Sequence, residues 1–232
     1  MGGKRLSTGW KLFILGALLV VIDQVIKILV KTNMTLGESF YVLGDWFRIT
    51  FVENEGMAFG FRFGGKVGKL LLTLFRLGLF GVLCWWIRSL ARRGDPPVLS
   101  ANSLSPALSA KVPSPNASSP TPTGVLVGLT LITAGAFGNI VDSVFYGQFF
   151  SASAPDVVAS FGGEPYAPLL FGKVVDMFYF PLIDTVWPDW MPFVGGHPFR
   201  FFEPVFNFAD SCVTVGAFYL ILFHYKFFAG RE

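Results

Sequence analysis

The sequence has few of the residues on which common structural and catalytic devices depend. Its 232 residues include two Cys and two His, with no C-x-x-C or Cys/His spacing, which excludes a disulfide scaffold and the common zinc motifs. Charged residues make up 14% of the chain, whereas soluble domains contain about 25%. The net charge of +3 is too small to indicate a nucleic-acid partner. A soluble domain is therefore not expected.

Hydrophobic residues are abundant instead, at 53% of the chain, and 27 residues are Phe. A helix that crosses a bilayer needs about 20 mostly apolar residues. Four stretches meet this requirement: 12–30, 70–87, 124–146 and 205–225. The sequence predicts an all-α membrane protein, a single membrane domain with four transmembrane helices. The stretch 94–123 is rich in Pro, Ser and Ala and is expected to be a disordered cytoplasmic linker.

The distribution of Lys and Arg predicts the orientation in the membrane. Both residues are denser in 1–11, 88–123 and 226–232 than in the long loops 31–69 and 147–204. Positive residues favour the cytoplasmic side, so both termini are expected in the cytoplasm and both long loops outside it. A cleaved signal peptide is the alternative for the first stretch, but no small-residue cleavage site follows Ile22.

Polar residues inside the apolar stretches mark a candidate site, because a charge in hydrocarbon is costly and is usually functional. Helical spacing puts several of them on shared faces: Asp23 with Lys27, Gly135 with Asn139 and Asp142, and Asn207 with Asp210. Arg76 lies roughly 9 Å into the second stretch at 1.5 Å per residue. All of them lie toward the outer ends, so we expect the faces to converge near the outer leaflet. For any single residue, a helix-packing contact is the alternative.

The carboxylates of this layer are the candidates for chemistry. Asp23, Asp142, Asp176 and Asp210 lie near it, and no plausible Ser–His pair exists. Two close carboxylates in a low dielectric share one proton, so one can activate water while the other polarises a carbonyl group. The spacing does not decide which two meet. Glu53 is expected to be exposed to solvent.

Three functions remain open at this point. The first is an aspartic endopeptidase. The second is a small transporter that uses Asp23, Lys27, Asp142 and Asp210 as a proton relay, and the third is a non-catalytic assembly subunit. A transporter needs polar groups near the bilayer midplane. The inner halves of the four stretches are almost bare of such groups, which favours the endopeptidase.

Five segments match, in order, the motifs of a known family. They are Asp23–Lys27 (DQVIK), Phe51–Gly60 (FVENEGMAFG), Gly135–Asp142 (GAFGNIVD), Val174–Phe178 (VVDMF) and Phe206–Ser211 (FNFADS). With these motifs on four predicted spans, the sequence resembles lipoprotein signal peptidase (signal peptidase II), a bacterial inner-membrane aspartic protease.

The resemblance implies a catalytic pair, Asp176 and Asp210. It also implies a set of supporting and substrate-binding residues: Asp23, Lys27, Asn54, Gly56, Gly135, Asn139, Asp142, Asn207 and Ala209. The implied substrate is a diacylglyceryl-modified prolipoprotein in the lipid bilayer, cleaved just before its lipidated lipobox Cys. The implied reaction needs no metal and no cofactor. One four-helix bundle is sufficient to hold the whole site, so a monomer is expected.

The resemblance also implies an extracytoplasmic β-cradle at about 31–69 and a mobile segment over the site. Two departures stand out. Ser143 occupies a position at which the family often has Arg, and Arg76 is the candidate replacement for that charge. An insertion, 148–173, separates segments that are usually nearly adjacent. We therefore expect an enlarged extracytoplasmic cap, 147–204. Its aromatic residues, Trp187, Trp190, Phe193 and Phe199, are expected at the level of the lipid headgroups, although a passive surface insertion is the alternative.

Overall fold

The computed structural model describes residues 6–55, 65–92, 120–201 and 203–230. Most of the expected linker, and Gly56 among the expected site residues, lie outside these ranges. The long helices are α1 (Thr8–Asn33), α2 (Gly65–Arg92), α3 (Thr123–Val141) and α5 (Phe208–Phe228). A π-helical turn, η2 (Asp142–Tyr146), and the short α4 (Gly147–Phe149) continue α3. Within the described ranges, four helical stretches are long and apolar enough to cross a membrane, which confirms the expected number of spans.

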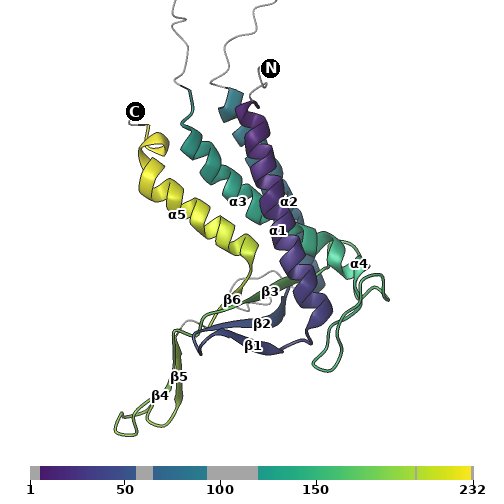
Figure 1. Ribbon diagram of the computed structural model, residues 1–232, viewed down its shortest axis with the longest axis vertical. Coiled ribbons are helices and arrows are strands. Elements are labelled where there is room, and N and C mark those ends of the chain that lie inside the picture. The colour runs from purple at the N-terminus through teal and green to yellow at the C-terminus, as the bar shows by residue number, and fades with distance from the viewer. Residues whose placement is uncertain (1–5, 56–64, 93–119, 202, 231–232) are drawn as a thin grey trace, which may run out of the picture.

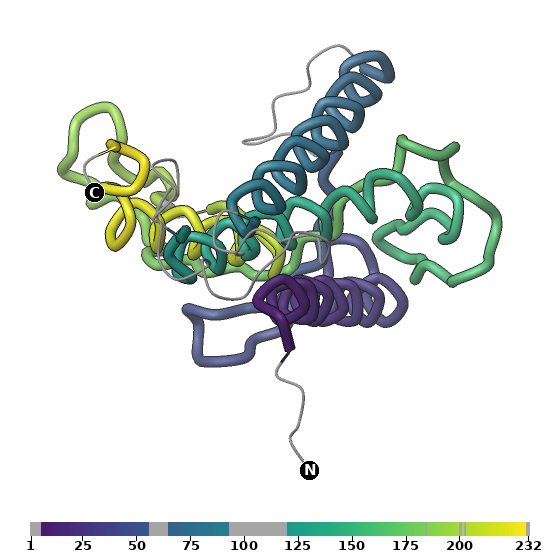
Figure 2. The backbone as a smooth tube through the Cα atoms, turned by 90° about the horizontal axis from the view of Figure 1, so that it is seen from above, coloured from purple at the N-terminus to yellow at the C-terminus, as the bar shows by residue number. Residues whose placement is uncertain are grey.

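Helix α3 is the centre of the helical part, and it packs against α1, α2 and α5. Seen along the helices, α1 and α2 diverge and α3 and α5 run side by side (Figure 2). Small residues on α3 allow this close approach. A Cβ atom on Gly135 would lie 2.3 Å from the carbonyl oxygen of Ala209, and one on Gly138 would lie 2.5 Å from a carboxylate oxygen of Asp23. Larger side chains at these positions would push α5 and α1 away.

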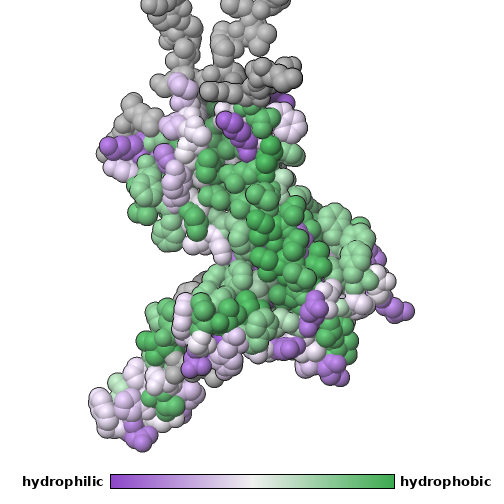
Figure 3. Space-filling model, viewed as in Figure 1, coloured by the Kyte–Doolittle hydropathy of each residue, from purple (hydrophilic) through white to green (hydrophobic). Residues whose placement is uncertain are grey.

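The outward faces of the helices are apolar. Large hydrophobic side chains such as Phe75, Trp85 and Phe223 are exposed on them. In the space-filling view, hydrophobic surface predominates over the middle of the helical part, and hydrophilic residues appear toward the end away from the sheet (Figure 3). Exposed apolar surface of this extent is expected where lipid, rather than water, surrounds the chain.

A four-stranded antiparallel sheet lies at the end of the helices opposite both chain termini (Figure 1). Its strand order is β1 (Ser39–Leu43), β2 (Phe47–Asn54), β3 (Val174–Tyr179) and β6 (Val205–Phe206). The stretch 147–204 was expected to be a long loop, and for Asp176 this is wrong, because Asp176 lies on a strand. Val-Val-Asp-Met-Phe-Tyr is short, mostly apolar and begins with two β-branched residues, which fits a buried strand, and β3 carries Asp176 in its middle.

The expected cap therefore consists of two separate parts with β3 between them. The 148–173 insertion folds back against η2, where the amides of Leu170 and Gly172 donate to the carbonyl oxygens of Val144 and Ser143. The other part is a hairpin of β4 (Ile183–Val186) and β5 (Pro198–Phe201) that projects from the sheet away from the helices (Figure 1). This direction does not favour the expected placement of its aromatic side chains at headgroup level.

Candidate active site

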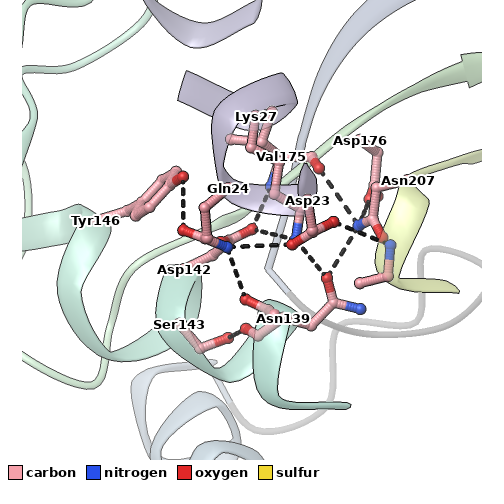
Figure 4. A network of polar contacts seen from close by, with 12 residues as sticks. Asp23, Gln24, Lys27, Asn139, Asp142, Ser143, Tyr146, Val175, Asp176 and Asn207 are labelled. Carbon is pink, nitrogen blue, oxygen red and sulfur yellow. Dashed lines mark hydrogen bonds and ion pairs between the residues drawn. The ribbon is translucent and has the colours of Figure 1, made fainter. Parts of the chain in front are cut away.

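The polar residues of the spans meet where the helices contact the sheet (Figure 4). Helix α1 contributes Asp23 and Lys27, and the junction of α3 with η2 contributes Asn139 and Asp142. Strands β2 and β3 contribute Asn54 and Asp176. Asn207 and Asp210 lie at the start of α5. Elements distant in sequence thus bring eight of the expected site residues into one hydrogen-bonded network.

Lys27 is the centre of this network and is fully buried. Its ammonium lies 2.9 Å from Oδ2 of Asp23 and 2.8 Å from Oδ2 of Asp142. It also donates a 2.7 Å hydrogen bond to Oδ1 of Asn139. A buried ammonium is tolerated only with such partners, because an unpaired buried charge costs several kcal/mol.

Asp23 and Asp142 hold the main chain on either side of the site. Oδ1 of Asp23 accepts a 2.9 Å hydrogen bond from the amide of Ala209, the residue before Asp210. Oδ2 of Asp142 accepts a 3.2 Å hydrogen bond from the amide of Val175, the residue before Asp176. These two carboxylates therefore fix α5 and β3 relative to α1 and α3.

Asn207 connects the two remaining aspartates. It is the N-cap of α5, and its Oδ1 accepts a 2.9 Å hydrogen bond from the amide of Asp210. The carboxylate of Asp210 lies 3.5 Å from the amide of Asn207, which completes a capping box. The Nδ2 of Asn207 donates to Oδ1 of Asp176 across 2.6 Å. A helix-start signal in the sequence, Asn-x-x-Asp, thus also orients the strand that carries Asp176.

Asp176 is almost fully buried, with 3% of its surface exposed. Burial, together with the charge of Asp210, raises the pKa of Asp176 to about 7. Hydrogen bonds from Asn54 Nδ2 (3.2 Å) and Asn207, and the charge of Lys27, act in the opposite direction. The carboxyl group therefore gains or loses its proton near neutral pH.

Asp210 is partly exposed and has its own hydrogen-bond donors. Nδ2 of Asn139 donates to Oδ1 of Asp210 across 2.8 Å. In the described parts of the chain, every buried side-chain nitrogen and oxygen atom has a hydrogen-bond partner. A fully satisfied network of this kind holds its members rigidly.

Arg76 on α2 is half-buried and interacts electrostatically with Asp210 and also with Asp176 and Asp142. Ser143, at the position where the resembling family often has Arg, is buried and donates to the carbonyl oxygen of Asn139. A positive charge thus acts on the aspartate pair from α2.

Sequence reasoning missed several members of the network. Nε2 of Gln24 donates to Oδ1 of Asp142 across 2.9 Å, and the hydroxyl of Tyr146 donates to Oε1 of Gln24. The position of Gln24 beside Asp23 and one turn from Lys27 was an available signal. The expectation that Glu53 is exposed is wrong, because its side chain is 3% exposed and pairs with Lys31.

Two expected site residues act through packing and the main chain. Gly135 lets α3 approach Ala209, and Ala209 contributes its amide to Asp23. Across the described ranges, no group of three or more His, Cys, Asp and Glu side chains is arranged to hold a metal ion.

Four apolar helices and a buried polar site at their sheet end define a multi-pass membrane protein. The sequence profile of the family described as Signal peptidase (SPase) II matches residues 15–104 and 116–226. A lipoprotein signal peptidase of Porphyromonas gingivalis is 43% identical over 220 residues, which cover 94% of this chain and 84% of that protein. One from Amoebophilus asiaticus is 33% identical over 92% of this chain and 77% of that protein. The chain belongs to the signal peptidase II family of proteases.

Solved structures support the same fold. A structure described as a bacterial membrane enzyme, determined by the in meso method, covers 96% of this chain and 92% of its own, with a TM-score of 0.53 and 20% identity. A second covers 95% and 96% with the same TM-score. The family match favours the peptidase over the transporter and the assembly subunit considered from the sequence.

Proposed function

We propose that this protein is a membrane aspartic endopeptidase that removes the signal peptide from diacylglyceryl-modified prolipoproteins. It hydrolyses the peptide bond just before the lipidated Cys. The relatives at 43% and 33% identity carry the name lipoprotein signal peptidase. The observation that carries the aspartic mechanism is the connection of Asp176 and Asp210 through Asn207.

Asp176 and Asp210 are proposed to share one proton. Because the pKa of Asp176 is raised to about 7 by burial and by the charge of Asp210, Asp176 is the proposed holder of the shared proton below about pH 7. Asp210, which accepts hydrogen bonds from Asn139 and Asn207, is proposed as the general base. Asp210 then takes a proton from water, whose oxygen attacks the carbonyl carbon of the scissile bond. Asp176 donates its proton to the carbonyl oxygen.

The tetrahedral intermediate collapses when the C–N bond breaks. The proton that Asp210 took from water passes to the nitrogen of the leaving Cys. The carbonyl group forms again, and the proton that its oxygen had received returns to Asp176. Arg76 acts electrostatically on both carboxylates and is proposed to stabilise the negative charge that develops on the oxygen. The remaining residues of the network, Asp23, Lys27, Asn54, Gly135, Asn139, Asp142, Asn207 and Ala209, are proposed to hold the pair in place, together with Gly56.

A lipid-anchored substrate is proposed to enter from the bilayer. The surface is hollowed between the helices and the sheet on the side where α5 begins (Figure 3). On the sheet, the ring of Phe180 stacks on Phe47 and on Phe206, the residue before Asn207. Such partly exposed rings suit the apolar residues and acyl chains of the substrate.

The orientation proposed from the Lys and Arg distribution fits this entry route. Both termini lie at the end of the helices opposite the sheet (Figure 1), and we propose that this end faces the cytoplasm. The site then lies near the outer leaflet of the bacterial inner membrane. The sheet and the 148–173 insertion are proposed to form the extracytoplasmic cradle and cap.

The test is cleavage of a defined substrate by the purified protein in detergent. A prolipoprotein carrying diacylglycerol on its lipobox Cys is compared with the same precursor without lipid. We expect a product that begins with the lipidated Cys, identified by mass spectrometry, and no cleavage of the unlipidated precursor. Equal cleavage of both would contradict the proposed substrate, and no cleavage of either would contradict the proposed activity.

A further inference from the structure

A second buried cluster of charges lies where the 148–173 insertion meets α1 and β2. Lys31 is fully buried and forms an ion pair with Oε1 of Glu53. The ammonium of Lys173 lies 3.0 Å from Oε2 of Glu53. The hydroxyl of Ser153 donates to Oε1 of Glu53 across 3.0 Å and accepts a 2.9 Å hydrogen bond from Lys31. Ser153 and Lys173 of the insertion thus bind the same carboxylate, that of Glu53, as Lys31 of α1 does.

Aromatic rings enclose the ammonium of Lys31. It lies 5.0 Å from the ring centre of Tyr166, 5.5 Å from that of Phe150 and 5.9 Å from that of Phe51. These distances fit cation–π contacts, which strengthen when the cation is removed from water. The Tyr166 hydroxyl accepts a 2.8 Å hydrogen bond from the amide of Lys173. The insertion therefore supplies most of the enclosure.

The pKa of Glu53 shows that its carboxylate is held in the charged form. Burial would raise the pKa of Glu53, but the ammonium groups of Lys31 and Lys173 outweigh this effect and hold the pKa below its usual range. Buried ion pairs contribute little net stability compared with apolar residues of similar size, whereas their geometry is specific. An arrangement of this kind suits a role in positioning better than one in stabilisation alone.

Strand β2 connects this cluster to the aspartate pair. Glu53 and Asn54 are its last two residues, and they pair with Val175 and Val174 of β3. Side chains alternate along a strand, so Glu53 points to the insertion while Asn54 points to the face of Asp176. Strand ends open readily unless they are held. The contacts of Glu53 hold this end, and with it the Asn54 amide, 3.2 Å from Oδ2 of Asp176.

We propose that Lys31, Glu53 and Lys173 form a positioning cluster, through which the insertion fixes the Asn54 amide on Asp176. This inference rests on the proposed function, because it assigns the cluster a role in the same reaction. The three residues do not touch the substrate. The insertion is then a working part of the site and not a passive addition to the surface.

The test compares Glu53→Gln and the double exchange Lys31→Met/Glu53→Gln with wild type. The double exchange removes both buried charges together. Lys173 keeps its charge, but its side chain is 36% exposed and can be solvated, so the fold is expected to be preserved if Glu53→Gln alone does not preserve it. Glu164→Gln, an exposed exchange in the same insertion, is the matched control. We expect kcat to fall about 10- to 100-fold with little change in KM, because small displacements of catalytic groups have effects of this size.

The pH profile separates positioning from a merely structural role. The charged groups Asp210, Lys27 and Arg76 still face Asp176 in these variants, so only the Asn54 contact changes. The hydrogen bond from Asn54 lowers the pKa of Asp176, so its loss is expected to move the alkaline limb of the kcat/KM profile to higher pH. The variant Asn54→Ala, which lacks the bond altogether, is expected to show the same shift. The Glu53→Asp variant, which retains the carboxylate, is expected to recover part of kcat.

Two outcomes separate this inference from the proposed function. If wild type cleaves the substrate but the double exchange keeps the wild-type kcat, or loses activity with an unshifted alkaline limb, the positioning cluster is wrong. If wild type does not cleave the substrate at all, the proposed function fails first.

Discussion

The side-chain amide of Asn207 donates a 2.6 Å hydrogen bond to Asp176, and the same residue is the N-cap of α5. The start of the helix that carries Asp210 is therefore attached to the strand that carries Asp176. A single side chain thus links the two elements that carry the carboxylates.

Exchanges at Asn207 separate capping from catalysis. Asn207→Ser keeps a capping oxygen but loses the donor to Asp176, whereas Asn207→Ala loses both. We expect both variants to lose about 10- to 100-fold in kcat. Only Asn207→Ala should also lose about 1 kcal/mol of stability, a decrease of roughly 2–4 °C in a chain of this size. Cleavage rates and thermal unfolding in detergent measure the two effects, and full activity of Asn207→Ser would refute the link.

The pH dependence of cleavage follows from the pKa of Asp176, which burial and the charge of Asp210 raise to about 7. Above this pH both carboxylates are charged and the shared proton is lost. We expect kcat/KM to fall about tenfold per pH unit above about pH 7. Asn54→Ala removes a hydrogen bond that favours the carboxylate, so its alkaline limb should lie at higher pH. A flat profile from pH 6 to 9 would show that no group with this pKa takes part.

The same pKa has a consequence for stability. The folded-state value of about 7 lies above the unfolded value of about 3.9, so the folded protein binds the proton more tightly. Binding of this proton therefore stabilises the folded state over the unfolded state. The stabilisation is fully present below about pH 4 and is lost as the pH rises through about 7. Asp176→Asn removes the buried charge. Its melting temperature should exceed that of wild type by at least roughly 2 °C at pH 8, and the difference should disappear as the pH falls to about 4.

This comparison is made by thermal unfolding of both proteins in the same detergent. Asp156→Asn, an exposed exchange in the insertion, should show no such pH-dependent difference. A lower melting temperature for Asp176→Asn than for wild type at pH 8 would contradict the conclusion that burial of the charged Asp176 carboxylate destabilises the folded protein.

Arg76 is expected to act on the transition state. Arg76→Ala should lower kcat by about 100-fold, the size typical for loss of a group that stabilises a developing oxyanion. Arg76→Lys, which keeps the charge at this position, should recover part of the loss. Separate measurements of kcat and KM show whether Arg76 stabilises the transition state or only binds the substrate. A change confined to KM would indicate substrate binding alone and would contradict the prediction.

Much of this arrangement could be predicted from the sequence. Asp23 and Lys27 are one helical turn apart in an apolar stretch, and that spacing alone placed them on one face. The strand around Asp176 was missed because its run of six residues has no alternation of apolar and polar side chains that would mark a strand. Glu53 was expected to be exposed because its partners, Lys31, Ser153 and Lys173, are distant in sequence. Long-range pairs of this kind have no local periodic signal.

The direct test of the central claim is the cleavage assay with Asp176→Asn and Asp210→Asn, each purified and shown to be folded, beside Asp156→Asn as the matched control. The account predicts that both site variants lose cleavage of the diacylglyceryl-modified prolipoprotein and that the control keeps the wild-type rate. Wild-type cleavage by either Asp176→Asn or Asp210→Asn would contradict it.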